Sequence, residues 1–434
     1  MKKHREIVSQ FLKKYSMGHE SIDMNFSCST FMREMEQGLE GELSSLKMLP
    51  SYLSAHKEIL LEEPVIVLDA GGTNFRSAVV HFDKDKKPVI ENYSLFPMPG
   101  AKGQVSKEEF FGTIIGYIGP LLNKSKKIGF CFSYPSEILP NGDGRLIQFT
   151  KEVKVKGLEG EVIGENLLKT MKNQGFTDYK DIVLLNDTAA TLLGGKASCL
   201  DRQFDSFIGF ILGTGTNTCY IEENINIKKL ENQIPVIGSM IINIESGGYD
   251  KNKRGIIDDE FDRDTANPGE YLHEKMISGR YIGGLISSVI KKGINEGLFS
   301  KEFSQSSVKL KEVTTQEMNE FLYYPYGDNR LACYGNYEDK IIIYHIIDSM
   351  MERAAKLTAI HLSSIILKTG KGKNPCSPVC IAAEGSLLYK SKLFKDKLNY
   401  YVKQFMNDEM GIYCEFIKGE DATLTGAAIA ALAI

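Results

Sequence analysis

No apolar run in this sequence is long enough to cross a membrane, no tract is of low complexity, and neither sign of charge is in strong excess. The formal net charge is −4 over 434 residues, so no global positive field favours nucleic acid or an anionic membrane surface. No continuous apolar segment follows the charged first residues, which argues against a secretory signal. We therefore expect no nucleic-acid partner and no membrane segment, and the length allows two or more domains with real cores.

The 8 cysteines are scattered along the chain. Only Cys376 and Cys380 lie close together, and no histidine or second cysteine pair stands near them at zinc-finger spacing. Several others lie in apolar, strand-like runs, where cysteine behaves as a small hydrophobe. The simplest expectation is a reduced cytoplasmic protein.

Two glycine-rich turns of the same form are the most informative segments, one within residues 65–80 and the other within residues 207–221. Each is an apolar strand, a tight turn of Gly, Thr and Asn, and a second strand. Glycine lets the backbone turn tightly and lets an anion approach the amide N–H groups. A strand after the turn excludes a Walker loop and a dinucleotide fingerprint, because both require a helix there. Two such turns predict a duplicated lobe with both turns facing one phosphate chain, and a pair of ordinary β-hairpins is the alternative.

Strand and helix patterns alternate along most of the chain, which predicts an α/β architecture with related lobes around a cleft. Several segments carry specific expectations: a helical region over residues 1–60 ended by Pro50, a strand over 236–244, an amphipathic helix over 270–292, one or two helices over 341–367 closed by Gly370, and an apolar helix over 425–434.

Polar residues at the ends of strands are the candidate chemical groups. Asn186 and Asp187 follow the apolar strand 182–185, and ligands of open α/β sheets lie outside the carboxyl ends of strands. Asp187 could accept a proton from a substrate hydroxyl, or it could cap a helix, and the local sequence leaves both open. Glu245 and Glu274, near a glycine turn and an early helical turn, could bind sugar hydroxyls or only interact with a helix dipole.

Three further residues flank a turn-rich loop at 135–144: Ser133 comes before it, and Thr150 and Lys151 come after it. Lys151, next to Thr150, could bring positive charge to a phosphate or hydroxyl, or it could simply be solvated. Ser133 could hydrogen-bond a polyol or only begin a turn.

Taken together, these segments resemble the hexokinase family, within the actin-like ATPase and sugar kinase superfamily. The matching segments follow the order of the family: the N-terminal helical region at 35–52, the first phosphate turn at 68–76, the sugar-recognition segment at 130–135 and 146–151, the catalytic motif at 185–188, the second phosphate turn at 212–220, the remaining sugar contacts at 242–247 and 267–279, and the adenosine-site turn at 384–386.

The resemblance implies an α/β, two-lobed actin-like ATPase (ribonuclease H-like) fold, with mixed sheets flanked by helices and a cleft between the lobes. Residues 1–64 and 188–424 would form the large domain, and residues 65–187 and 425–434 the small domain. The implied activity is ATP-dependent phosphorylation of a hexose, glucose first, at its 6-hydroxyl, with Mg²⁺. The implied protein is a monomer or homodimer that acts in glycolysis.

The resemblance also implies a role for each matching residue. Asp187 would take the proton from the sugar hydroxyl as it attacks the γ-phosphate, and Lys151 would offset charge on the transferred group. Asp69 and Asp187 would hold Mg²⁺, through water. The sugar would be bound by Ser133, Thr150, Lys151, Asn186, Asp187, Asn217, Glu245 and Glu274; the nucleotide would be bound by Asp69, Gly71, Gly72, Thr73, Asn74, Arg76, Gly213, Thr214, Gly215, Gly385 and Ser386.

Four positions depart from the family pattern, and the first two leave the sugar open. Ser246 stands where the family usually has tryptophan, which this chain lacks entirely, and Tyr271 stands where glutamine is frequent. Glu384 replaces a usual aspartate, and residues 422–426 replace a glycine-rich motif near the adenine. Another hexose or an amino sugar such as N-acetylglucosamine is therefore an alternative substrate. A sugar-sensing regulator without catalysis, or a chaperone-type or filament ATPase, is the alternative class.

Overall fold

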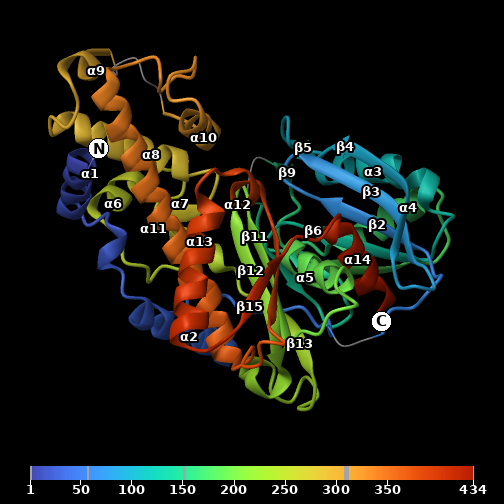
Figure 1. Cartoon of the computed structure of the whole chain (residues 1–434). Helices are drawn as coiled ribbons and strands as arrows, with labels where there is room; N and C mark the ends of the chain where they lie inside the picture. Colours follow the sequence, from blue (N-terminus) through green and yellow to red (C-terminus); the bar gives the residue numbers. More distant parts are fainter. Residues whose placement is uncertain (1, 56–57, 150–152, 307–311, 434) are drawn as a thin grey trace.

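The computed structural model describes residues 2–55, 58–149, 153–306 and 312–433, and its two lobes are each built on a mixed sheet (Figure 1). The five-stranded sheet contains β2 (Val65–Ala70), β3 (Asn74–Phe82), β4 (Pro88–Pro97), β6 (Lys127–Phe132) and β10 (Asp181–Leu185). The six-stranded sheet contains β1 (Leu49–Pro50), β11 (Ser206–Leu212), β12 (Thr216–Glu223), β13 (Ser239–Asn243), β14 (Val379–Glu384) and β15 (Cys414–Ile417).

The two sheets repeat one topology. In the first, β2, β3 and β4 are antiparallel neighbours, and β6 and then β10 run parallel to β2 on its other side. In the second, β11, β12 and β13 are antiparallel neighbours, and β14 and then β15 run parallel to β11. The first glycine-rich turn joins β2 to β3, and the second joins β11 to β12. The expected α/β fold with a duplicated lobe is confirmed.

Two helices, α5 (Asp187–Ala197) and α14 (Ala422–Leu432), lie between the two sheets (Figure 1). One buried cluster joins Val67 of β2, Ala189 of α5, Ile241 of β13 and Ala427 of α14. The helices cross closely, because a Cβ added at Gly426 would lie 1.9 Å from the carbonyl oxygen of Ala190. The small residues of α14 therefore set the distance between the lobes.

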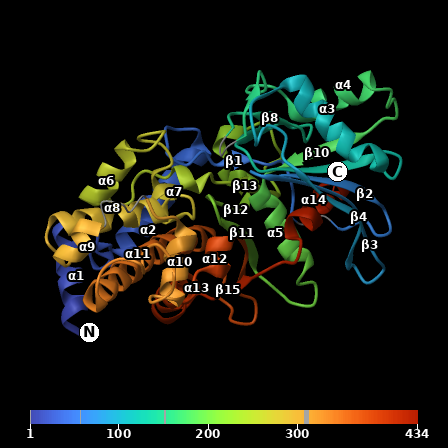
Figure 2. The ribbon, with the colours of Figure 1, turned by 90° about the horizontal axis from the view of Figure 1, so that it is seen from above.

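The outer face of each sheet is covered by further helices. In the five-stranded lobe, α3 (Lys107–Ile118) and α4 (Ile163–Asn173) bury apolar side chains against the sheet. In the six-stranded lobe the core helix is α11 (Tyr337–Thr369), which ends at Gly370 in the left-handed conformation as expected (Figure 2). Within the described part of the chain, no helix is both long enough and apolar enough to cross a membrane.

The other α-helices described in the six-stranded lobe are α1 (Lys2–Lys14), α2 (Met24–Glu40), α6 (Ile256–Arg263), α7 (Leu272–Ile277), α8 (Ile282–Asn295), α9 (Lys301–Ser306), α10 (Thr315–Tyr323), α12 (Ser386–Lys390) and α13 (Phe394–Val402). Two short ribbons complete the other lobe: β5 (Val105–Ser106) with β9 (Val155–Lys156), and β7 (Ser136–Ile138) with β8 (Gly144–Leu146).

Three expectations about elements were wrong. The helical N-terminal region stops at Glu40, and Leu49–Pro50 is a strand that pairs with β13. The strand expected over 236–244 is only Ser239–Asn243, and Ile237 before it is 91% exposed. The helix expected over 270–292 is divided into α7 and α8, because the backbone of residues 279 and 280 hydrogen-bonds to the turn at 213–215 instead.

Candidate active site

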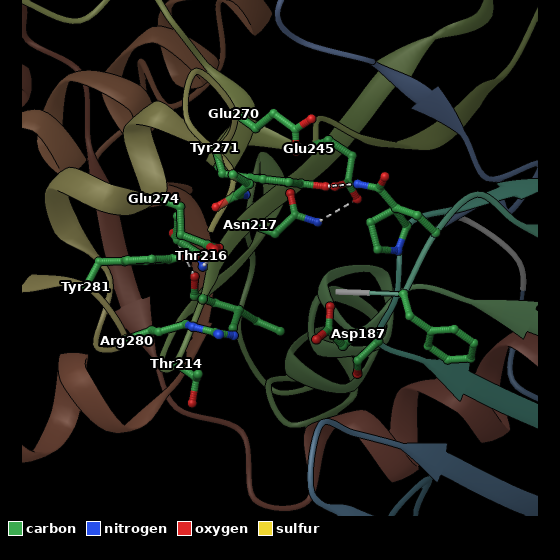
Figure 3. Close-up of a pocket in the computed structure, with 18 of the residues that line it drawn as sticks. Asp187, Thr214, Thr216, Asn217, Glu245, Glu270, Tyr271, Glu274, Arg280 and Tyr281 are labelled. Atoms are coloured by element: carbon green, nitrogen blue, oxygen red, sulfur yellow. Dashed lines mark hydrogen bonds between the residues drawn. The ribbon is translucent and has the colours of Figure 1, made fainter. Parts of the chain in front are cut away.

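A cavity of about 340 Å³ is lined by residues from both lobes (Figure 3). Ser133 and Gln148 come from the loops after β6 and β8, and Asp187 comes from the start of α5. The turn after β11, β12 and the segment before α7 supply the opposite wall. Because strand ends from both sheets meet here, the cavity lies where α/β folds bind ligands.

Asp187 lies in the first turn of α5, and Asn186 is the N-cap of this helix. The Asn186 Oδ1 accepts from the backbone N–H of Thr188 at 3.0 Å and from its hydroxyl at 2.6 Å. Capping therefore falls to Asn186, and the half-buried Asp187 carboxylate lines the cavity. The carboxylate lies at the N-terminal end of the helix, where the helix dipole attracts negative charge.

Asn217 and Glu245 form a polar network on the opposite wall (Figure 3). The Asn217 Nδ2 donates to Asn243 Oδ1 at 2.8 Å and to Glu245 Oε1 at 3.2 Å, and Asn243 Nδ2 donates to the same Glu245 oxygen at 2.8 Å. Burial raises the pKa of Glu245, while the bonds from Asn243 and Asn217 favour its charged form. Glu245 has a φ of 58°, a conformation that is costly for a residue with a Cβ, so the surrounding contacts must hold it there.

Glu274 and Tyr271 frame the rest of this wall. The Glu274 Oε2 accepts from the backbone N–H of Thr216 at 2.9 Å, which fixes the carboxylate beside the second turn. The Tyr271 hydroxyl accepts from Gln148 Nε2 and thereby links the two sides of the cavity. Burial raises the pKa of Tyr271 to about 12, so its hydroxyl stays protonated near neutral pH.

A second cavity of about 950 Å³ shares part of its wall with the first. Both cavities are lined by Ile211, Thr214, Gly215 and Arg280. The second is lined in addition by Gly72 and Thr73 of the first turn, by Ser386, and by residues of α10. Residues of both glycine-rich turns therefore line this second cavity.

The first turn is held by contacts behind the cavity wall. The Gly71 N–H donates to the Asn74 carbonyl at 3.0 Å, and the Gly71 carbonyl accepts from the Tyr134 hydroxyl at 2.7 Å. Arg76 pairs with Asp69 Oδ2 and also donates to the Thr423 hydroxyl at 2.9 Å. The turn and the start of α14 are thus joined through one buried carboxylate.

The described carboxylates around the two cavities do not surround a divalent cation by themselves, so phosphate groups would have to supply most of the ligands of such an ion. Within the described ranges, no three His, Cys, Asp or Glu side chains gather closely enough to ligate a metal by themselves. Asp187 lines the smaller cavity and offers the hard oxygen donors that Mg²⁺ prefers, and Mg²⁺ takes few protein ligands when phosphates supply the rest. Asp69 is buried, pairs with Arg76 and lines neither cavity, so a direct bond from Asp69 to the ion does not fit this arrangement.

The sequence-based site residues fall into three groups in the structure. The 340 Å³ cavity is lined by Ser133, Asn186, Asp187, Thr214, Gly215, Asn217, Glu245 and Glu274. The 950 Å³ cavity is lined by Gly72, Thr73, Thr214, Gly215 and Ser386. The lining of neither cavity includes Asp69, Gly71, Asn74, Arg76, Gly213 or Gly385. Thr150 and Lys151 lie outside the described residues.

Sequence reasoning missed several residues of the site, among them Gln148, Asn243, Arg280 and Thr423. Asn243 carried a signal, because it stands two residues before Glu245 and alternate residues of a strand share a face. Thr423 lies within residues 422–426, which the sequence marked only as a departure from a motif near the adenine, and nothing in the pattern linked it to Arg76, 347 residues away.

Three comparisons with known proteins all find hexokinases. Two family models, each described as Hexokinase, match residues 7–197 and 207–433. Hexokinase-5 of Oryza sativa subsp. japonica is 28% identical over 429 residues, which cover 92% of this chain and 84% of that protein. Hexokinase-7 of the same plant is 28% identical and covers 92% of this chain and 91% of that protein.

Among solved structures, a hexokinase from Schistosoma mansoni complexed with glucose superposes with a TM-score of 0.82 at 23% identity, covering 100% of this chain and 99% of that one. A second hexokinase structure superposes with a TM-score of 0.71 at 20% identity. At these identities the likeness shows the fold.

Proposed function

This chain belongs to the hexokinase family, and from that premise we propose how its residues carry out the ATP-dependent phosphorylation of a hexose. The smaller cavity would hold the hexose, with its 6-hydroxyl toward Asp187. The larger cavity would hold ATP, with the triphosphate between the two glycine-rich turns. Glucose is the first expected substrate.

One observation carries this proposal: the two cavities share the wall formed by Thr214 and Gly215, and Asp187 lines the smaller one. A hydroxyl in the smaller cavity and a phosphate passing along the shared wall would therefore be neighbours. Phosphoryl transfer depends mainly on such positioning and on charge stabilisation, because the transferred group needs little covalent help.

In the proposed mechanism Asp187 is the general base. Its carboxylate takes the proton of the 6-hydroxyl as the oxygen attacks the γ-phosphate, and the sugar keeps the new O–P bond while ADP leaves. The other sugar hydroxyls would be bound by Ser133, Asn186, Asn217, Glu245 and Glu274. The proposed contributions of Thr150 and Lys151 stay predictions from the sequence.

The adenosine would lie beside Ser386 and Gly385, and Mg²⁺ would neutralise charge on the phosphates. Asp69 and Asp187 are the residues proposed to hold that ion, through water in the case of Asp69. Asp69 also fixes Arg76, so in this proposal it organises the first turn from behind.

We propose the domain division expected from the sequence, with 1–64 and 188–424 as the large domain and 65–187 and 425–434 as the small domain. The hydrogen bond between Gln148 and Tyr271 supports closure of the two domains across the sugar. Closure would exclude water, which limits hydrolysis of ATP without sugar.

A coupled assay of ADP release over a panel of sugars tests this function. Glucose, mannose, fructose, 2-deoxyglucose and N-acetylglucosamine should be compared at fixed ATP and Mg²⁺. Turnover with glucose is the expected result. Turnover only with N-acetylglucosamine would instead assign an amino-sugar kinase, and sugar binding without turnover on any sugar would indicate a regulator. ATPase activity that does not depend on sugar would contradict the proposed transfer of phosphate from ATP to a hexose.

A further inference from the structure

Arg280 lies in the segment between α7 and α8, and it lines both cavities. The Gly279 N–H donates to the Gly213 carbonyl at 2.8 Å, and the Arg280 N–H donates to the Thr214 carbonyl at 3.0 Å. A Cβ added at Gly279 would lie 2.6 Å from the Gly213 oxygen, so the two backbones approach as closely as they can. The backbone of Arg280 is therefore fixed to the second glycine-rich turn.

Among the described residues, Arg280 is the one cationic residue that lines the smaller cavity. The other charged lining residues are all acidic: Asp187, Glu245, Glu270 and Glu274. Figure 3 shows the Arg280 side chain reaching from the α7 side toward the middle of the cavity, near Thr214. Such a concentration of negative charge opposes the approach of a triphosphate, and a nearby guanidinium would offset it.

The Arg280 side chain is exposed, and among the described residues it forms no ion pair with a carboxylate. Its guanidinium lies 5.6 Å from the ring centroid of Tyr281, a contact that orients the side chain without neutralising it. A guanidinium can donate two parallel hydrogen bonds to phosphate oxygens, and it stays charged at any pH relevant here.

We propose that Arg280 binds the β- and γ-phosphates of ATP and stabilises the charge on the transferred phosphoryl group. This inference rests on the proposed function for the identity of the nucleotide, and it adds a residue that no motif in the sequence indicated. Because Arg280 is hydrogen-bonded to the turn that carries Thr214, both would contact the phosphates as one rigid unit.

The test compares Arg280→Ala, Arg280→Met and Arg280→Lys with the parent enzyme. Loss of the charge-assisted hydrogen bonds to phosphate should lower kcat/KM for ATP about 10- to 100-fold in the Ala and Met variants. Lysine should restore part of the loss, because it returns the charge without the planar pair of donors. The KM for sugar should stay within about twofold of the parent.

A binding experiment separates phosphate contact from a structural effect. Calorimetry should show weaker binding of MgATP to Arg280→Ala and Arg280→Met and unchanged binding of adenosine. The matched control is Arg33→Ala, which removes the same charge from an exposed position on α2. Arg280→Met keeps much of the side-chain volume, so it remains informative if the alanine variant does not fold.

The proposal would be overturned if MgATP affinity and kcat/KM for ATP stayed within twofold of the parent in Arg280→Met. Equal losses for adenosine and MgATP would also overturn it, because they would show a general distortion of the site. A parent enzyme that phosphorylates no sugar would refute the proposed function, and the comparison of MgATP with adenosine would still decide the role of Arg280.

Discussion

Replacing Glu384 with glutamine should change how the stability of this protein depends on pH. Glu384 ends β14, pairs with Ile211 of β11 just before the second glycine-rich turn, and is half-buried. Burial raises its pKa from 4.5 to about 7; Arg76 opposes this shift, and the charges of Asp69 and Asp187 add to it. The pH window of the effect therefore lies between about 4.5 and 7.

The direction follows from proton binding in the two states. Between pH 4.5 and 7 the carboxyl is ionised in the unfolded chain but still protonated in the folded protein, so folding takes up a proton. Stability then falls as pH rises, by about 1.4 kcal/mol per pH unit, and the total cost is about 3 kcal/mol above pH 7. Below pH 4.5 the cost vanishes, because both states are protonated.

Glutamine has no proton to lose at this position, so this cost should disappear in Glu384→Gln. As the pH rises from 4.5 to 8, the free energy of unfolding of the variant should increase by about 3 kcal/mol relative to that of the parent. Different packing in the variant adds only a constant difference, which does not change with pH. If the chain unfolds as one unit, this gain raises Tm by about 3 °C at pH 8 relative to pH 4.5. If one lobe unfolds alone, the shift is about twice as large.

Thermal unfolding can be followed by far-ultraviolet circular dichroism at pH 4.5, 6, 7 and 8, since the chain has no tryptophan for fluorescence. The control is Glu42→Gln, which makes the same chemical change at an exposed position after α2. A difference in Tm between Glu384→Gln and the parent that is constant from pH 4.5 to 8 would refute the reasoning.

Two further predictions concern contacts between distant residues, and a third concerns a buried histidine. Tyr271→Phe removes the hydroxyl that accepts from Gln148, so the KM for sugar should rise about 2- to 10-fold in steady-state kinetics; an unchanged KM would argue against the link. Arg353→Met should lower the free energy of unfolding by about 3–5 kcal/mol in urea, because it leaves the buried Asp258 carboxylate, 3.0 Å from the guanidinium, without its partner. Burial holds the pKa of His361 well below 6.5, so only the unfolded chain takes up its proton in mild acid and stability falls as pH drops below 6.5. His361→Phe should therefore raise Tm more at pH 5.5 than at pH 8, and an equal shift at both would count against this.

The parts of the site that sequence could predict are those encoded by local pattern. Both glycine-rich turns lie between strands as expected, because apolar strand and turn residues specify a hairpin without help from distant segments. Asp187 is found after a buried strand for the same reason. The repeated form of the two turns was also enough to predict that the lobes share one topology.

The parts that sequence could not predict depend on contacts across the fold. The periodicity of residues 270–292 is helical throughout, but hydrogen bonds to the turn at 213–215 outweigh local propensity and divide the helix. Asn186 and Asp187 are both suitable caps by composition, and only the bonds from Asn186 to Thr188 decide between them. Tyr271 contacts Gln148 across 123 residues, a distance over which no pattern in one sequence carries information.

The central claim is that Asp187 removes the proton from a sugar hydroxyl in a site otherwise built for binding. Its most direct test is the turnover of Asp187→Asn, measured as hexose phosphate formed, together with calorimetric binding of the same sugar. A general base contributes about 10²- to 10⁴-fold to the rate, so kcat should fall by that amount while sugar affinity stays within a few-fold. A variant that keeps parental kcat would contradict the claim, and so would one that loses sugar binding and turnover in equal measure.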